Sequence, residues 1–327
     1  MDNTLNNLNL DNNKDFKLLK SKAPHIKSPI TTQKIMLDVI IALIPTTIAG
    51  IYFFGIKSLF LIIISIFFAI LSEFIFQKLT HKEITISDLS AAVTGLLLAL
   101  NLPVTTPLWI VAIGSIIAII LVKQCFGGLG FNFMNPALAA RAFILSAWPE
   151  SISNYTLDGI TTATPLTYIK NGEASIISLS DAFVGNIPGC IGEVSALALI
   201  IGGIYLLYRK VITWHIPITY ISTVFLLTTI IGRDVYLKEN GFYEILTGGL
   251  LIGAIFMATD YTTSPMTKSG QVVFAFGCGL ITSLIRIFGG YPEGVSYAII
   301  LMNLTVPIID HYIIPKSFGF TKSLKHY

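Results

Sequence analysis

The chain has 327 residues, of which 54% are hydrophobic and 12% are charged, and its mean hydropathy is +0.76. These values exclude an ordinary soluble domain, in which about a quarter of the residues are charged. The formal net charge of +3 is too small and too scattered to indicate a nucleic-acid-binding surface. The apolar runs are long and uniform, unlike the alternating strands of a membrane β-barrel, so we expect an all-α membrane protein.

The amino-terminal segment, residues 1–34, is rich in asparagine and lysine and lacks the apolar core of a signal peptide. We expect it to form a flexible basic arm on the cytoplasmic side of the membrane. Residues 316–327 are expected to form a short cytoplasmic tail.

Between these ends, the apolar segments predict about ten transmembrane helices, at roughly 20 residues for each crossing. The third, fifth and eighth are expected to be short or broken. The predicted spans are 36–56, 58–78, 87–103, 107–123, 134–148, 191–208, 212–231, 243–259, 270–288 and 294–314.

The lysines and arginines orient these helices, because cytoplasmic loops carry an excess of positive charge. With a cytoplasmic amino terminus, 15 of the 21 basic residues lie inside and four lie outside, with Arg141 and Arg286 left within helices. The count includes Lys123 among the inside residues. It predicts that the longest loop, residues 149–190, faces the outside.

An internal repeat divides the predicted helices into two groups of five. Residues 94–107 are echoed by residues 247–265, and residues 123–135 are echoed by residues 286–303. An odd number of helices in each half would invert one half relative to the other, as in many transporters. The two predicted halves are residues 35–148 and 191–315.

Polar side chains within or at the ends of the predicted spans are expensive in lipid unless they are paired or face a cavity. Near helix ends, interfacial water is the simpler explanation, and this applies to Glu73, Asp260 and Asp310. Arg141 is the best candidate for an anion contact, since it lies one or two turns from the outside loop and could pair with a phosphate. The remaining members of this set are Asn101, Asn135, Arg286 and Asn303.

The three cysteines, Cys125, Cys190 and Cys278, match no metal-binding spacing, and each is expected to be a small buried residue in a helix. No Walker loop, dinucleotide fingerprint or haem-attachment motif occurs in the sequence. From the residues alone, a channel or secondary transporter with a central site is therefore the default function.

One polar stretch stands out within the outside loop. It runs from Asp158 to Leu166 and contains three threonines within four residues, after an Asp-Gly pair and before Pro165. The proline keeps the preceding residues out of a helix, so the hydroxyl groups lie on a loop. These residues fit either a capped surface loop or a chemical site.

Residues 158–164 resemble the D-x-x-[S/T]-G-A-T flavinylation motif, in which the last threonine receives FMN through a phosphoester bond. Together with Gly127 to Ala137, Met257 to Pro265 and Phe288 to Gly294, they resemble the family of D subunits of bacterial Rnf electron transport complexes. That family is related to the B subunit of the sodium-translocating NADH:quinone oxidoreductase. The resemblance covers residues 23–315.

The resemblance implies that Thr164 carries covalent FMN and that a flavin transferase recognises Asp158, Thr161 and Ala163. Thr162 stands where the motif has glycine, a departure that bears on the efficiency of modification. The resemblance also implies a bacterial inner-membrane protein whose FMN loop is extracytoplasmic.

It further implies a protein that is not catalytic alone and that relays electrons between partner subunits carrying flavin and iron–sulfur groups. The whole complex would couple electron transfer between ferredoxin and NAD to Na⁺ or H⁺ translocation. The partners are then the other Rnf subunits, the flavin transferase and membrane lipid, with no nucleic acid. A small-solute channel or secondary transporter without a redox role is the alternative.

Overall fold

The computed structural model describes residues 30–157, 160–162, 164–170, 178–231, 240–290 and 293–314. From Thr32 onward these residues belong to one unit. Most of the expected amino-terminal arm and the whole expected tail lie outside the described residues. The last three residues of the expected arm, 32–34, instead begin the first helix.

Four helices are long and apolar enough to cross a membrane: α1 (Thr32–Phe54), α2 (Ile56–Leu79), α13 (Lys268–Phe288) and α14 (Val295–Tyr312). Only Gly55 separates α1 from α2, with a φ of 72° that ends one helix and starts the next. These helices, together with several shorter apolar ones, make the chain a multi-pass membrane protein.

The shorter apolar helices correspond to five of the six other predicted spans. They are α3 (Ser90–Leu100), α4 (Leu108–Ile117) with its π-helical continuation η2 (Ala118–Gln124), α5 (Pro136–Ala147), α9 (Ala196–Tyr208) and α10 (His215–Ile231). The third and fifth predicted spans, α3 and α5, have only 11 and 12 residues, so the prediction that they are short is confirmed.

The eighth predicted span is broken, as expected. It consists of α11 (Asn240–Leu246), α12 (Leu250–Ile252) and the π-helical turn η3 (Gly253–Met257). Gly248 and Gly249 separate α11 from α12 with φ angles of 71° and 69°, which side chains other than glycine rarely adopt. The count of ten membrane crossings stays a prediction.

The predicted outside loop contains several short helices and strands. They are α6 (Pro149–Ile152), an antiparallel hairpin of β1 (Tyr155–Leu157) and β2 (Ile160–Thr162), α7 (Pro165–Lys170) and α8 (Leu179–Val184). Elsewhere in the chain, a 3₁₀ turn, η1 (Ile86–Asp88), precedes α3. The sequence interpretation missed the hairpin, although Asp-Gly between two threonine-containing runs is a hairpin signal.

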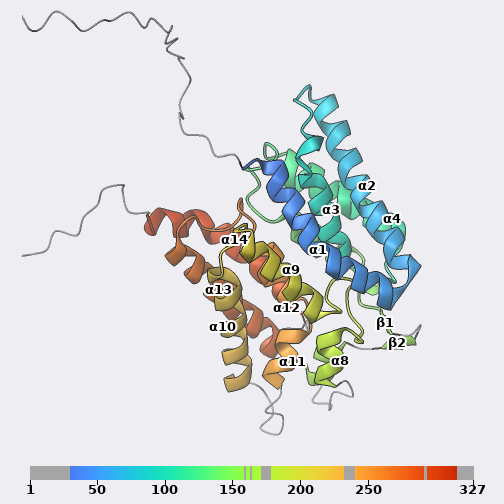
Figure 1. Ribbon diagram of the computed structural model, residues 1–327, viewed down its shortest axis with the longest axis vertical. Helices are drawn as coiled ribbons and strands as arrows, with labels where there is room; N and C mark the ends of the chain where they lie inside the picture. Colours follow the sequence, from blue (N-terminus) through green and yellow to red (C-terminus); the bar gives the residue numbers. More distant parts are fainter. Residues whose placement is uncertain are drawn as a thin grey trace, which may run out of the picture. The chain divides into compact units, whose positions relative to one another are not determined.

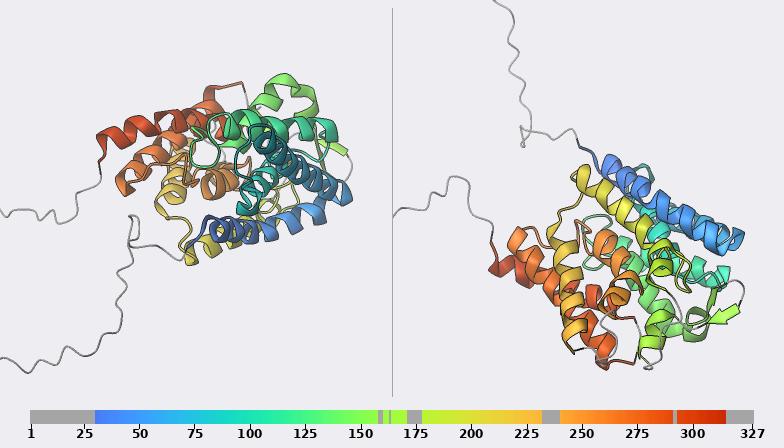
Figure 2. Two further views of the ribbon diagram at one scale, coloured as in Figure 1. Left: turned by 90° about the horizontal axis from the view of Figure 1, so that it is seen from above. Right: turned by 60° about the horizontal axis from the view of Figure 1, so that its bottom comes forward.

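Small residues let several helices approach closely. A side chain on Gly202 in α9 would overlap the carbonyl oxygen of Ala42 in α1, and one on Gly279 in α13 would meet Thr223 in α10. Close backbone approach at small residues is the usual basis of helix packing in membranes, where lipid leaves little hydrophobic drive. The pairs α1–α9 and α10–α13 lie side by side in Figure 1 and Figure 2.

Helices from the two predicted halves pack against each other. From the first half, α1 contacts α9 and α5 contacts α14, both of which belong to the second half. Figure 2 shows α1 in blue beside α9 in yellow-green. The interior therefore contains side chains from both halves, and the inverted repeat itself stays a prediction.

Candidate functional site

Two of the sequence stretches that carried the family resemblance meet inside the protein. Asn135 caps the start of α5, since its Oδ1 accepts hydrogen bonds from the main-chain nitrogens of Ala137 and Leu138 at 3.0 and 3.3 Å. Its Nδ2 donates to the carbonyl of Met257 at 3.3 Å. The segments 127–137 and 257–265 are thus joined by a buried polar contact.

Asn303, on α14, completes this polar junction. With its amide oriented to satisfy both neighbours, it donates to the carbonyl of Thr263 at 3.0 Å and accepts from the main-chain nitrogen of Asn135 at 3.1 Å. Both amides are therefore paired in the interior, one of the two situations in which such groups are tolerated within a membrane.

A cavity of about 80 Å³ lies beside the junction, between α1, α3, the start of α5 and the segment after η3. Its wall is mostly apolar, and its polar lining includes Asn132, Asp260 and Thr262. Asp260 accepts hydrogen bonds from the hydroxyls of Thr262 at 2.9 Å and Thr263 at 3.3 Å. None of the described residues of the threonine stretch 158–166 belongs to this lining.

The expectation that Glu73 is solvated by interfacial water is wrong. Its side chain is fully buried rather than solvated at a membrane interface, and its Oε1 lies 2.8 Å from the Nζ of Lys123. Lys123 also donates to the hydroxyl of Ser90 at 2.6 Å, and Gln124 donates to Glu73 Oε1 at 2.6 Å. Lys123 is therefore a buried partner, not the exposed inside charge assumed in the orientation count.

Lys123 and the neighbouring Gln124 both lie in the π-helical turn η2. It brings two consecutive side chains, Lys123 and Gln124, to the same carboxylate oxygen of Glu73. A regular α-helix directs neighbouring residues about 100° apart, so periodicity along the sequence carries no signal for such a site.

Asp310 lies in the last turn of α14, where the sequence placed it, and accepts a hydrogen bond from the main-chain nitrogen of Met266 at 3.1 Å. It is half-buried, in keeping with a residue at a helix end.

Arg141, in α5, lies at the centre of a second buried charged cluster. Its Nη2 is 2.5 Å from Oε2 of Glu293, and its Nη1 donates to the Ser296 hydroxyl at 3.0 Å and to Oδ1 of Asn101 at 3.4 Å. Protein groups thus already accept hydrogen bonds from both terminal nitrogens of the guanidinium. The phosphate contact predicted for Arg141 stays a prediction, and in this arrangement it would compete with Glu293.

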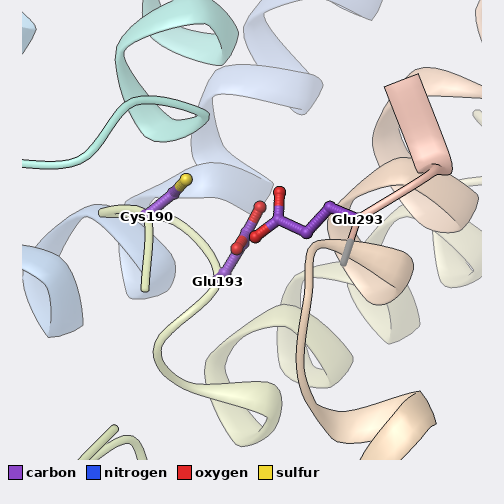
Figure 3. Close-up of side chains that lie close together, drawn as sticks. All are labelled: Cys190, Glu193 and Glu293. Atoms are coloured by element: carbon purple, nitrogen blue, oxygen red, sulfur yellow. The ribbon is translucent and has the colours of Figure 1, made fainter. Parts of the chain in front are cut away.

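The same cluster includes a cysteine and a second glutamate from the irregular segment before α9. Sγ of Cys190 and carboxylate oxygens of Glu193 and Glu293 lie within 4.8 Å of one another. Figure 3 shows the two carboxyl groups turned toward each other, with the thiol beside them. Sequence reasoning missed both glutamates, although Glu293 lies in the stretch from Phe288 to Gly294 and Glu193 lies in the predicted span 191–208.

The cysteines fit their prediction only in part. Cys278 is buried in α13, as expected. Cys190 is buried but lies outside any helix, and Cys125 is exposed at the end of η2. The prediction of three buried helical cysteines is therefore wrong for Cys125 and, in its placement, for Cys190.

Thr164, the predicted FMN anchor, directly precedes α7. Its side chain is 4% exposed, and its hydroxyl lies 2.9 Å from the hydroxyl of Thr167. Its carbonyl accepts the main-chain hydrogen bonds of Thr167 and Tyr168, which start the helix. Thr164 is thus held in a defined position at the junction of hairpin and helix.

The structure describes only some of the residues around Thr164. Asp158 and Ala163 lie outside the described residues. Thr161 and Thr162 lie in β2, paired in register with Thr156 and Tyr155. Their predicted roles in recognition by a transferase stay predictions.

The segment that carries Thr164 packs on the broken helix. A side chain on Gly248 would overlap Leu166, the second residue of α7, and would lie 3.1 Å from Nη2 of Arg286. Arg286 is itself fixed in position here, because its Nη1 donates hydrogen bonds to the main-chain carbonyl and to the carboxylate of Glu244, at 2.6 Å each. The intramembrane arginine Arg286 is therefore paired, and it supports the surface that Leu166 of α7 contacts.

Comparison with known proteins identifies the family. The chain matches the NQR2, RnfD, RnfE family over residues 19–319. It is 47% identical over 318 residues to the D subunit of the Na⁺-translocating ferredoxin:NAD⁺ oxidoreductase complex of Acetobacterium woodii, covering 95% of this chain and 98% of the relative. It is 42% identical over 315 residues to the D subunit of the proton-translocating ferredoxin:NAD⁺ oxidoreductase complex of Clostridium ljungdahlii, covering 91% and 95%.

A more distant relative, the D subunit of the ion-translocating oxidoreductase complex of Escherichia coli, is 32% identical over 348 residues, with 92% of this chain and 98% of the relative covered. These alignments extend over nearly the full length of every protein compared. The chain therefore belongs to the NQR2, RnfD, RnfE family, as a multi-pass membrane protein similar throughout to the D subunits of Rnf complexes.

Proposed function

We propose that this chain is the electron-relaying D subunit of an ion-translocating ferredoxin:NAD oxidoreductase complex and that it carries FMN esterified to Thr164. The observation that carries the proposal is the position of Thr164. It is the last threonine of a flavinylation-like stretch, and it stands at the junction of the hairpin with α7 in a chain of this family.

The surroundings of Thr164 fit a phosphoester. Its hydroxyl contacts another hydroxyl, that of Thr167, rather than a charged group, so releasing it costs about 1 kcal/mol. Because Thr164 is buried, a transferase can reach it only when the segment lifts from Gly248. This movement must free Leu166, the buried second residue of the six-residue helix α7, from its contact at Gly248.

Bound FMN would supply one-electron transfer, while the protein holds and orients it. The chain has three cysteines, distant in sequence, which do not make the four-thiolate set of an iron–sulfur cluster. Electrons must therefore come from and pass to other subunits. The partners are the other Rnf subunits that carry flavin and iron–sulfur groups, the flavin transferase that modifies Thr164, and membrane lipid.

Two relatives with similar identity to this chain are named for different ions, Na⁺ at 47% and the proton at 42%. Identity to these relatives therefore does not indicate the coupling ion. The proposal places the chain in a bacterial inner membrane with both termini in the cytoplasm and the Thr164 loop outside. The excess of lysine and arginine on the inside supports this orientation.

Mass spectrometry tests the covalent bond. When the chain is co-expressed with a flavin transferase, the peptide holding Thr164 should gain one FMN and fluoresce in a denaturing gel. Thr164→Ala should abolish labelling, and Thr161→Ala should lower it by weakening recognition. Thr167→Ala removes the neighbouring hydroxyl and should leave labelling in place. An unmodified wild-type peptide, beside a control substrate that the same transferase labels, would refute the proposal.

A channel or secondary transporter is the competing function, favoured by the cavity beside the broken helix η3. Reconstitution in liposomes separates the two. Flux of a small solute through the flavin-free chain would support the transporter, whereas flavin-dependent electron transfer only within the assembled complex supports the relay.

A further inference from the structure

The cluster around Arg141 contains more negative than positive charge. Arg141 provides one positive charge, and Glu193 and Glu293 provide two negative charges when both are ionised. The side chains of Arg141 and Glu193 are 7% and 3% exposed, so water does not compensate the difference. An unpaired buried charge is costly, and a group in this position usually neutralises instead.

The two glutamates are not equivalent partners of Arg141. Nη2 of Arg141 lies 2.5 Å from Glu293, a short charge-assisted hydrogen bond, but 3.7 Å from Oε1 of Glu193, beyond hydrogen-bond length. Glu293 is therefore the ionised partner, and the excess negative charge belongs to Glu193.

A second observation points to the same residue. Oε1 of Glu193 is buried, and among the described groups none donates a hydrogen bond to it. It lies against Gly249 in the broken helix, where any side chain would overlap it. As an ionised oxygen it would be both charged and unsatisfied, whereas as a carboxylic acid it can donate to a facing carboxylate (Figure 3).

Among the residues that the structure describes, the other groups facing Glu193 bring no positive charge. Cys190 is a buried thiol beside Arg141, and burial together with the Glu193 carboxyl group raises its pKa well above the usual value of 9.0, so it stays neutral. Burial, with the Glu293 carboxylate as a further cause, raises the pKa of Tyr155 in β1 well above its usual value of 10.0, so its hydroxyl stays neutral.

A metal ion does not fit this arrangement. Nη2 of Arg141 contacts all three groups that face one another, lying 3.6 Å from Sγ of Cys190 and closer to Glu293. The guanidinium thus holds the place where a cation would bind, and like charges repel at that distance. A proton adds the missing positive charge without displacing Arg141.

We propose that Glu193 and Glu293 form a proton-binding site, in which Glu193 holds the proton and Glu293 remains ionised beside Arg141. The site lies near the segment that carries Thr164, because Glu193 packs at Gly249 and Leu166 packs at the adjacent Gly248. Two carboxyl groups that share one proton are a known result of close approach in a buried site.

Infrared spectroscopy of the purified full-length chain tests this assignment. The wild type should show the carbonyl stretch of a protonated carboxylic acid at neutral pH, where exposed carboxyl groups are ionised. Glu193→Gln should remove that band. Glu150→Gln, which changes an exposed glutamate of α6, is the matched control and should retain it.

Thermal unfolding gives a second readout. Glu193→Gln replaces a neutral acid by a neutral amide of the same shape, so the melting temperature at neutral pH should stay near that of the wild type. Glu293→Gln removes the close partner of Arg141 and should lower it clearly. A proton held only in the folded state also makes the wild-type folding constant fall with rising pH, by up to about tenfold per pH unit, and Glu193→Gln should abolish this fall.

Three results would overturn the proposal: no carboxylic acid band in the wild type, a band that survives in Glu193→Gln, or equal destabilisation by Glu193→Gln and Glu293→Gln. Stabilisation by added Na⁺, Ca²⁺ or Zn²⁺ that Glu193→Gln abolishes would also overturn it, in favour of a cation. None of these readouts involves flavin, so their outcome is independent of FMN attachment to Thr164.

Discussion

Glu73 and Lys123 pair inside the protein with side-chain exposures of 0% and 2%, whereas in the pair of Asp38 with Arg209 the arginine is half exposed. Both pairs join different helices, but their energetics differ. Water screens the exposed pair and leaves it a small net contribution. In the buried pair, each charge compensates a partner that has lost its water. Removal of one side chain therefore leaves the other charge buried without a partner.

We therefore predict that Lys123→Met destabilises the protein by about 3–5 kcal/mol. The matched change in the exposed pair, Arg209→Met, should cost less than about 1 kcal/mol. Unfolding in detergent, followed by melting temperature or denaturant, measures both.

The double variant Glu73→Gln with Lys123→Met provides the control for charge. It removes both charges, so it should be more stable than Lys123→Met alone. Equal destabilisation by the single and double variants would show that Lys123 acts through packing of its chain rather than by compensating Glu73.

Among the helices, the contact of α1 with α9 depends on one residue without a side chain. Gly202 lies where any side chain would overlap the carbonyl of Ala42. By contrast, no atom of the described residues lies within 4 Å of the position that a side chain on Gly290 would take. Gly290 lies in the stretch from Phe288 to Gly294 that carried the family resemblance and Gly202 lies in no such stretch, so the packing of neighbouring elements, not the motif, shows which glycine has no room for a side chain.

Gly202→Val should separate α9 from α1 and cost about 1–3 kcal/mol, the usual range for overpacking. Gly290→Ala should change the stability by no more than about 0.5 kcal/mol. Melting temperatures of the two variants in the same detergent give the comparison, and a neutral Gly202→Val would mean that the two helices separate at no cost.

Across the whole molecule, the orientation proposed from the basic residues can be tested at the two ends of α2. This helix has 24 residues, about 36 Å at 1.5 Å per residue, enough to cross a hydrocarbon core of about 30 Å. Its ends are marked by Lys57, expected outside, and Lys82, expected inside, and both are exposed.

In intact cells, Lys57→Cys should react with a membrane-impermeant thiol reagent, and Lys82→Cys should react only after the membrane is opened. The exposed Cys125 is replaced by serine in both variants to remove its background reaction. Labelling in the reverse order would place the amino terminus and Thr164 on the opposite sides from those proposed.

Much of the architecture could be predicted from local sequence. The breaks around α3, α5 and the Gly248–Gly249 pair follow from residues that interrupt apolar runs, and the structure has them where they were expected. The hairpin before Thr164 could also have been predicted from its Asp-Gly pair. In contrast, the interfacial placement of Glu73 was wrong, because distance along the chain to a helix end does not measure burial.

The sequence by itself determined the class of protein, its apolar segments, the stretch that ends at Thr164 and the family, since hydropathy and motifs are properties of neighbouring residues. Only the tertiary structure decided which buried charges meet. Lys123 finds Glu73 across 50 residues through a π-helical turn, and Arg141 finds Glu293 across 152 residues through the packing of α5 on α14. Partner choice for a buried charge depends on which helices pack together, and that is a property of the whole fold rather than of any one segment.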